Sequence, residues 1–351
     1  MKRILRFIAI CAVIALVVPF IFAAGTKDKA AEEGEFTIGY VCNYMSHQWY
    51  QNIILGMKEK APTVGAALKI ADSNLDQNRN IAEAESFIAQ KVDVLVITPV
   101  DPNAIGTVIQ KAKAAKIPVV TEGFVVEGAD TYVGIEDYWS GYYGGEEAGK
   151  YVKKNFGGKK ANILLIDLPF EIACRARCDG FMDGFTKSGH PFELIARVDG
   201  GGMIDQALDV ATDSFTAHRE INVVFGINDD SALGAYEAAK AVGMNTNPKQ
   251  FLITTCGFEG APAMKALEDP NHPLKVAICM FPQMVGYGLV QAAYDIYSGK
   301  SVPEVQYTPT VAVTPETQIY YSWKGEDVAL DFDKAGKIKP PTRSDWWDQG
   351  K

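Results

Sequence analysis

The amino-acid sequence predicts an α/β protein of two doubly wound parallel-sheet lobes joined by a multi-strand hinge. From Phe36 onward short apolar runs alternate with amphipathic segments, and this programme runs twice along the chain. Strands that alternate with helices form a parallel sheet covered on both faces. The length of 351 residues also exceeds one typical domain of about 100 to 200 residues. Two similar lobes are therefore expected.

The first lobe contains four apolar runs that predict strands, at residues 37–42, 68–71, 94–98 and 117–121. Helices are predicted between them, where apolar residues recur at helical spacing. Tyr50, Ile53 and Met57 mark the first of these helices, and segments 81–88 and 105–112 mark the next two. The first lobe is therefore predicted to consist of alternating strands and helices.

The second lobe repeats the pattern with strands expected at 162–166, 194–198, 223–225, 251–255 and 275–278. Apolar spacing predicts helices over 204–211, 232–239 and 285–292. Two short extended pieces follow, at 305–307 and 311–313. They suit a chain that crosses back between lobes. We expect one lobe over 36–137 and 281–309, and the other, with a tail, over 138–280 and 310–351.

The N-terminus has the order of a cleavable signal peptide. Lys2, Arg3 and Arg6 precede an apolar run over 7–22, and small residues follow up to position 25. A transmembrane anchor is the alternative, but Pro19 and the small residues keep the run below the roughly 20 apolar residues that a span needs. We expect a signal peptide over 1–25, a flexible leader over 26–35 and a periplasmic product.

Composition excludes some classes of function. The formal net charge of −9 argues against nucleic-acid partners, which require a basic surface. Cys42, Cys256 and Cys279 lie in apolar strand-like runs and are predicted to be buried thiols. Cys174 and Cys178 have no His or further Cys nearby to complete a metal site. We therefore expect no metal and no cofactor.

Polar and aromatic residues follow the predicted strands directly, and in open parallel sheets ligands gather at the carboxyl ends of strands. They include the segment 43–50, Asp72, Glu122, Asp167 and Glu259. Asp and Asn at such places also cap the next helix, which is the alternative for Asp101, Asp199, Asp229 and Asp230. Two lobes whose strand ends face each other would share one cleft.

The chain resembles the ribose-type periplasmic sugar-binding proteins of ABC transporters, the type I periplasmic binding protein family, over nearly its whole mature length. The matching segments are 38–50, 94–99, 117–121, 177–181, 223–230 and 257–260, with Pro282 and Gly286. This resemblance implies a protein that closes two lobes around a sugar-like ligand and delivers it to a membrane permease. It also implies a monomer.

Site residues carry over from the resemblance by position. Trp49 and Tyr50 match aromatics that stack on the sugar, and His47 falls where the family often has an Asn. The family's polar residues of the second lobe match Arg177, Asn228 and Glu259. Paired donors and acceptors on such groups suit adjacent hydroxyls. For Tyr50 a core position is the alternative, and for Arg177 a surface pair with Asp179 or Asp183.

The pocket departs from ribose binders at four positions. Gly123 and Phe124 replace an Asp-Arg pair, Gly202 replaces a ring, and Met280 replaces a Gln. Glu122, one residue earlier, could supply the missing acid. The changes add apolar surface, so we expect Phe124 and Met280 to favour another pentose, a polyol, a deoxy sugar or a less sugar-like ligand.

Other classes of protein fit less well. An enzyme would need a nucleophile beside a base or a metal cluster, and the sequence has no Gly-x-Ser-x-Gly elbow or phosphate loop. A repressor of related fold would lack the signal peptide. A sensory protein that presents its ligand to a membrane receptor would use the same cleft and stays an alternative. We expect a binding protein and not an enzyme.

Overall fold

The computed structural model describes residues 36–316, 318–323, 326–330 and 337–338. The expected signal peptide over 1–25, the leader over 26–35 and the Trp346-Trp347 pair lie outside the described residues. No helix in the described part of the chain is long and apolar enough to cross a membrane.

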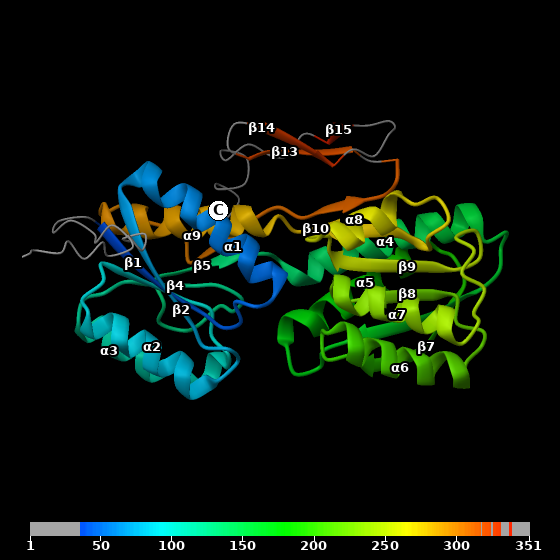
Figure 1. The fold of residues 1–351 in the computed structure, drawn as a ribbon, viewed down its shortest axis with the longest axis horizontal. Helices are drawn as coiled ribbons and strands as arrows, with labels where there is room; N and C mark the ends of the chain where they lie inside the picture. Colours follow the sequence, from blue (N-terminus) through cyan, green and yellow to red (C-terminus); the bar gives the residue numbers. More distant parts are fainter. Residues whose placement is uncertain (1–35, 317, 324–325, 331–336, 339–351) are drawn as a thin grey trace, which may run out of the picture. The chain divides into compact units, whose positions relative to one another are not determined.

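The first lobe is built on a six-stranded sheet (Figure 1). Its strands, in spatial order, are β11 (Val305–Tyr307), β5 (Thr131–Gly134), β4 (Val119–Thr121), β3 (Val94–Ile97), β1 (Phe36–Cys42) and β2 (Ala66–Asp72). All neighbours pair in parallel. The carboxyl ends of these strands therefore lie at one edge.

The second lobe repeats the plan with a second six-stranded sheet. Its strands, in spatial order, are β12 (Val311–Val313), β10 (Leu274–Cys279), β9 (Leu252–Gly257), β8 (Val223–Gly226), β6 (Ala161–Asp167) and β7 (Phe192–Asp199). Only β12 runs antiparallel to its neighbour. The two predicted parallel-sheet lobes are confirmed.

Helices cover both faces of the first sheet. On one face lie α1 (Gln48–Lys60) and α9 (Pro282–Tyr297), and on the other α2 (Gln77–Ala89) and α3 (Gly106–Ala114). The period-2 alternation of β1 explains this, since Ile38 and Tyr40 pack with α1 and α9 while Val41 packs with α2 and α3. Short 3₁₀ helices lie at Ala61–Val64 and Pro102–Ala104.

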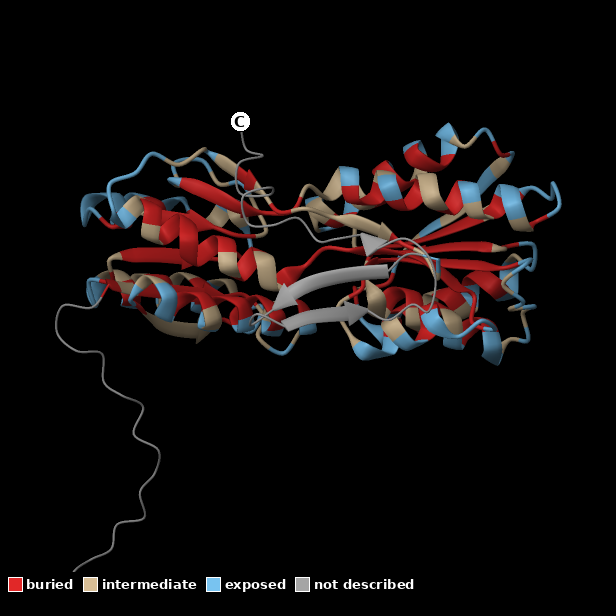
Figure 2. Ribbon diagram, turned by 90° about the horizontal axis from the view of Figure 1, so that it is seen from above, coloured by how far each residue is buried: buried red, intermediate tan, exposed pale blue. Residues whose placement is uncertain are grey.

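The second sheet is covered in the same way. Its helices are α4 (Asp137–Asn155) and α5 (Ile172–Lys187) on one face, and α6 (Ile204–Ala217), α7 (Asp229–Ala241) and α8 (Ala261–Glu268) on the other. The central strands of both sheets are buried (Figure 2), whereas the edge strands β2 and β7 are largely intermediate or exposed. One apolar cluster joins Ile163 and Leu165 of this lobe to Ile38 and Tyr40 of the first.

The chain passes between the sheets three times. It leaves the first sheet after β5 for α4, returns from β10 to α9, and crosses again from β11 to β12. At the second crossing Phe281 has a left-handed backbone, with φ 48°. A small third sheet follows, ordered β14 (Glu326–Leu330), β13 (Gln318–Trp323) and β15 (Lys337–Ile338), and the sequence pattern did not predict it.

Further elements that the apolar spacing did not predict include β5, α4 and α8. The α4 segment carries four glycines, Gly141, Gly144, Gly145 and Gly149, and glycine disfavours a helix interior. These glycines instead let α4 approach α5 closely. A Cβ at Gly141 or Gly145 would fall on the carbonyl oxygen of a residue of α5. Tertiary packing therefore overrides the local propensity.

Candidate functional site

The carboxyl ends of strands from both sheets enclose a cavity of about 420 Å³, called the central cavity below. The residues that line it come mainly from the loops after β1, β2 and β4 to β10, and from the N-terminal parts of α1, α4, α5 and α6. All nine residues singled out in the sequence analysis line it: His47, Trp49, Tyr50, Glu122, Phe124, Arg177, Asn228, Glu259 and Met280.

His47 begins α1 and caps it. Its Nδ1 accepts a hydrogen bond from the backbone N–H of Trp49, at 3.1 Å. An accepting Nδ1 carries no proton, so the proton of the neutral ring is on Nε2. Burial lowers the pKa of His47 below its ordinary value, which keeps the ring neutral. Its Nε2–H is thus a donor available to a ligand.

Glu122 follows β4 and is held from two sides. Thr98 Oγ1 donates to Oε2 at 2.8 Å, and Trp49 Nε1 donates to Oε1 at 3.3 Å. Thr98 is itself within hydrogen-bond distance of the Tyr40 hydroxyl, at 3.0 Å. Burial nevertheless raises the pKa of Glu122 to about 7. The carboxyl is fixed in place and titrates near neutral pH.

The two aromatic residues of the first lobe differ in exposure. Trp49 is only 9% exposed and Tyr50 is half-buried, although both line the central cavity. Tyr50 also packs against the apolar cluster that the lobes share. The two interpretations of Tyr50, core and cavity, therefore describe different parts of one side chain.

Arg177 lies on α5 and is anchored by two bonds. Its Nε donates to Asp137 Oδ1 at 2.7 Å, and Nη1 donates to the carbonyl of Ile227 at 3.0 Å. The alternative of a pair with Asp179 or Asp183 is excluded. Those carboxylates bind Arg197 and the Tyr138 hydroxyl instead.

Asn228 caps α7 and also faces the cavity. Its Oδ1 accepts from the backbone N–H of Ser231 at 2.9 Å, and Nδ2 donates to the carbonyl of Gly202 at 2.8 Å. These bonds leave the second N–H of the amide group available to a ligand. Asn228 thus combines the cap that such residues commonly form with a position in the cavity wall.

Asp229, beside Asn228, is structural. Its carboxylate accepts from Thr255 Oγ1 and from the backbone N–H groups of Phe258 and Glu259, at 2.8 to 3.0 Å. It does not line the central cavity. By these bonds Asp229 holds the loop that carries Glu259. The alternative weighed for this residue, a cap on the next helix, is wrong, because Asn228 caps α7.

An apolar wall completes the cavity. Gly123 has φ +77°, a conformation that favours glycine, and so turns the chain between Glu122 and Phe124. Met280, after β10, is 1% exposed, and its sulfur accepts from Cys256 Sγ at 3.7 Å. Phe124 and Met280 offer a ligand contact surface but no strong hydrogen-bonding group.

Several cavity residues escaped the sequence analysis. Asp137 is the partner of Arg177, and Glu171 and Gln206 also line the cavity. Asp137 is the first residue of α4, a helix that the pattern did not reveal. Asn43 and Tyr44 line the cavity too, and both lie in the segment 43–50 that the sequence had already indicated.

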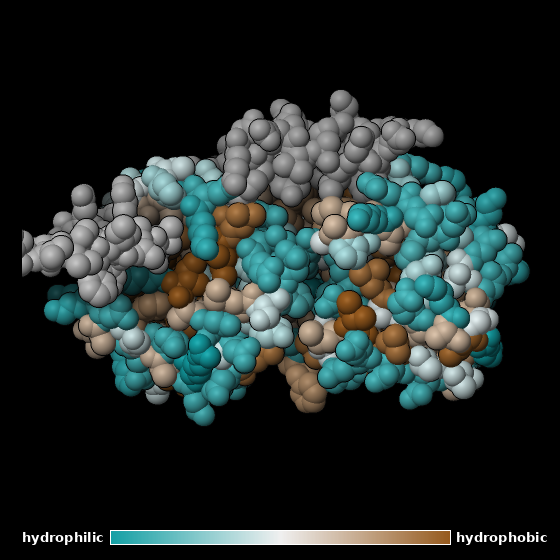
Figure 3. Space-filling model, viewed as in Figure 1, coloured by the Kyte–Doolittle hydropathy of each residue, from teal (hydrophilic) through white to brown (hydrophobic). Residues whose placement is uncertain are grey.

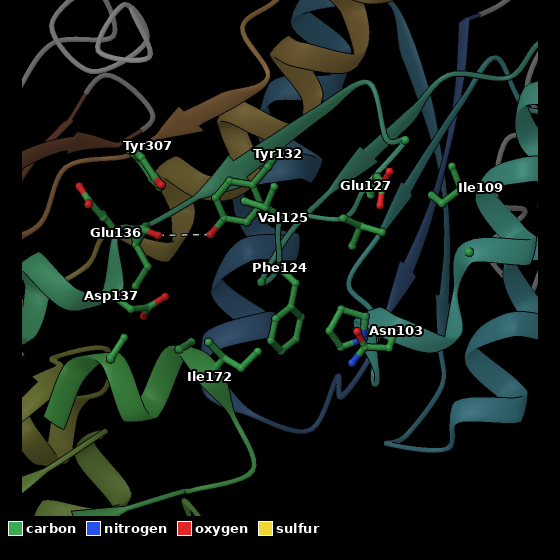
Figure 4. A pocket seen from close by; sticks show the side chains of 18 of the residues that line it. Asn103, Ile109, Phe124, Val125, Glu127, Tyr132, Glu136, Asp137, Ile172 and Tyr307 are labelled. Carbon is green, nitrogen blue, oxygen red and sulfur yellow. Dashed lines mark hydrogen bonds between the residues drawn. The ribbon is translucent and has the colours of Figure 1, made fainter. Parts of the chain in front are cut away.

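Phe124 lines both the central cavity and an outer groove of about 880 Å³, which Figure 4 shows. Figure 4 shows Phe124 and Ile172, from different lobes, on the two sides of this groove. The surface is otherwise largely hydrophilic on the face shown in Figure 3, with small apolar groups. A smaller groove of about 270 Å³ lies at His47 and Asp230.

All five cysteines outside the expected signal peptide are free and buried. The prediction of buried thiols at Cys42, Cys256 and Cys279 is confirmed, and burial raises the pKa of each to about 12. Within the described residues no group of three or more His, Cys, Asp or Glu side chains could hold a metal ion.

Comparisons with known proteins agree with this architecture. A family model for a periplasmic binding protein domain matches residues 38–301. The ribose import binding protein of Bacillus subtilis (strain 168) is 28% identical over 293 residues, which cover 83% of this chain and 90% of that protein.

Solved structures give the same picture. A Mycobacterium smegmatis protein in complex with beta-D-fucofuranose is 26% identical, with a TM-score of 0.71, and the match covers 80% of this chain and 91% of that one. An ABC transporter solute-binding protein from the same organism, with bound glycerol, is 25% identical, with a TM-score of 0.71 and coverage of 80% and 94%.

Proposed function

The chain belongs to the periplasmic binding protein family, in its ribose-type, type I form, and from this membership we propose that it is the solute-binding protein of an ABC import system. It binds a sugar, polyol or related small molecule in the central cavity and delivers it to a membrane permease. Binding, and not catalysis, is the role of this cavity. The ribose import proteins among its relatives favour import over presentation to a sensory receptor.

The observation that carries the proposal is the origin of the cavity walls. Side chains from the strand ends of two separate sheets line one space of about 420 Å³. Arg177, Asn228 and Glu122 are each held by protein hydrogen bonds before a ligand arrives. Preorganised polar groups beside an aromatic and an apolar wall suit a small polyhydroxylated ligand.

We propose the following lobe boundaries, cellular location and oligomeric state. One closing unit is 36–137 with 281–309, and the other is 138–280 with 310–351. Residues 1–25 direct the protein to the periplasm and are removed, and the mature protein is a monomer. Light scattering of the mature protein and mass spectrometry of its N-terminus test these points. A dimer, or retention of residues 1–25 after export, would contradict them.

A thermal-shift screen of the mature protein against sugars, polyols and signalling metabolites tests the function. A ligand that binds only the folded state raises the stability by about 2.7 kcal/mol at a hundredfold excess over its Kd. We expect several related carbohydrates or polyols to raise the melting temperature, and unrelated compounds not to. A screen in which only non-carbohydrate signalling metabolites stabilise the protein would contradict the proposal.

Ribose is expected to bind poorly. A sugar hydroxyl buried against Phe124 or Met280 loses its water and gains no partner, at a cost of roughly 1 to 3 kcal/mol for each hydroxyl. Two such losses lower the affinity about a hundredfold or more. Titration of ribose beside deoxy sugars, polyols and other pentoses checks this. Submicromolar ribose binding would contradict it.

A further inference from the structure

The charges around the central cavity do not balance. Glu122, Asp137, Glu171 and Glu259 line it, while Arg177 is the only Lys or Arg among the described residues that do so. Arg177 is already paired with Asp137 at 2.7 Å. The carboxyl groups of Glu122, Glu171 and Glu259 thus have no Lys or Arg of the described cavity wall as an ion-pair partner. Burial raises the pKa of each of them.

Among the described residues that line the central cavity, the two side-chain atoms that are buried and have no hydrogen-bond partner are both acceptors. Asn43 is only 7% exposed, and its Oδ1 has no hydrogen-bond partner among the described residues. Glu259 Oε2 is also buried and without one. Both residues line the central cavity. A buried acceptor without a donor is costly, so these two atoms point to a ligand that supplies donors.

Two of the three charged neighbours of Glu259 disfavour its ionised form. Burial is the main cause that raises the pKa of Glu259 well above its ordinary value. The negative charge of Asp229 is the second cause. Arg177 opposes this effect, and Asp230 adds a smaller contribution in the same direction as Asp229. A positive charge at Glu259 would stabilise its ionised form and supply hydrogen-bond donors at once.

We propose that the ligand is a sugar or polyol bearing a protonated primary amine, and that the ammonium group lies against Glu259. This deepens the proposed function and rests on it. An ammonium group has three donors and no acceptor, whereas a hydroxyl has one donor. It therefore supplies donors to the buried acceptor of Glu259 and a positive charge that stabilises the ionised carboxylate. The acceptor of Asn43 then takes a hydroxyl or N–H donor of the same ligand.

Calorimetric titration with matched sets of probes tests this inference. Each set contains an amine, its neutral parent and, for the sugars, its N-acetyl form: glucosamine, galactosamine and mannosamine, with glucamine against sorbitol. The N-acetyl form keeps the nitrogen but removes the charge. In at least one set we expect the amine to bind at least about tenfold more tightly than its neutral counterparts, which corresponds to about 1.4 kcal/mol.

The variants locate the effect. Glu259→Gln keeps the shape of the side chain and removes its charge, and it should reduce the preference for the amine to about threefold or less. Glu268→Gln removes one negative charge from an exposed position at the end of α8 in the same lobe, and it should leave the preference unchanged. An equal loss of preference in both variants would contradict a role for Glu259.

The remaining outcomes separate this inference from the proposed function. If neutral sugars or polyols bind and no amine is preferred, the inference is wrong and the proposed function stands. If neither these probes nor any carbohydrate of the thermal-shift screen binds, the proposed function is wrong, and the inference fails with it.

Discussion

Trp49 links the wall of the cavity to its buried acid, because the indole that lines the cavity also donates to Glu122 at 3.3 Å. The sequence predicted the position of this ring but not its bond. Position follows from the rule that strand ends carry ligand groups. The bond joins residues 73 positions apart, which no local pattern reveals.

We expect Trp49→Ala to weaken ligand binding by about 1 to 3 kcal/mol, because it removes an aromatic contact. The variant should also melt at a lower temperature, since the side chain is 9% exposed and its loss leaves a void. Trp49→Phe keeps a ring and loses only the N–H, and should be affected less in both respects. Calorimetry and thermal melting measure the two effects. Unchanged ligand affinity in Trp49→Ala would show that the ring makes no ligand contact.

Glu122 should make stability depend on pH. Burial raises its pKa from 4.5 to about 7, so the folded protein keeps this proton between those values while the unfolded chain has lost it. The contribution to stability is therefore present below pH 4.5 and is lost as the pH rises to about 7. The expected loss is about 3 kcal/mol.

Urea denaturation of the protein and of Glu122→Gln at several pH values isolates this contribution. The contributions of the other titrating groups cancel in the difference between the two free energies of unfolding. As the pH rises from 4.5 to about 7, the free energy of unfolding of the Gln variant should increase relative to that of the parent protein. Above about pH 7 this difference should stay constant. A constant difference over this range would mean that Glu122 titrates normally.

At the scale of helices and strands, glycine packing positions the site. Gly141 and Gly145 of α4 face backbone carbonyls of α5, and Gly180 and Gly184 of α5 face backbone carbonyls of α4. The first lobe uses the same device, because Gly56 of α1 faces a carbonyl of α9. Helices in such contact hold Asp137 on α4 beside Arg177 on α5.

Gly145→Ala is expected to destabilise the protein by roughly 1 to 3 kcal/mol, because its methyl group would overlap the carbonyl of Phe181 and force the helices apart. Gly106→Ala is the matched control. Gly106 is the first residue of α3, and a Cβ there would meet no atom within 4 Å. The control should be neutral or stabilising by up to about 1 kcal/mol. Similar losses in both variants, measured by denaturation, would contradict the packing argument.

The strands were more predictable than the junction between the lobes. Every predicted strand overlaps one in the structure, because apolar runs bounded by polar residues mark buried strands directly. The segment from β5 to α4 was missed, since its helix is rich in glycine and depends on α5 for its packing. Asp137, which is the true partner of Arg177, was missed with it.

At the scale of the whole molecule, the function depends on two sheets sharing one cavity. Three passages of the chain join the sheets, and residues of both lobes line the cavity. The repeat of the βα programme predicted two lobes with facing strand ends. The chemistry of the ligand was less predictable, because it depends on atoms such as Asn43 Oδ1 and Glu259 Oε2, whose lack of partners appears only in three dimensions.

The crystal structure of the complex with the ligand that most raises the melting temperature tests the central claim most directly. We expect one ligand molecule in the central cavity, with Glu122 of the first lobe and Arg177 and Glu259 of the second in hydrogen-bond contact. A ligand bound outside this cavity, or held by residues of one lobe alone, would contradict it.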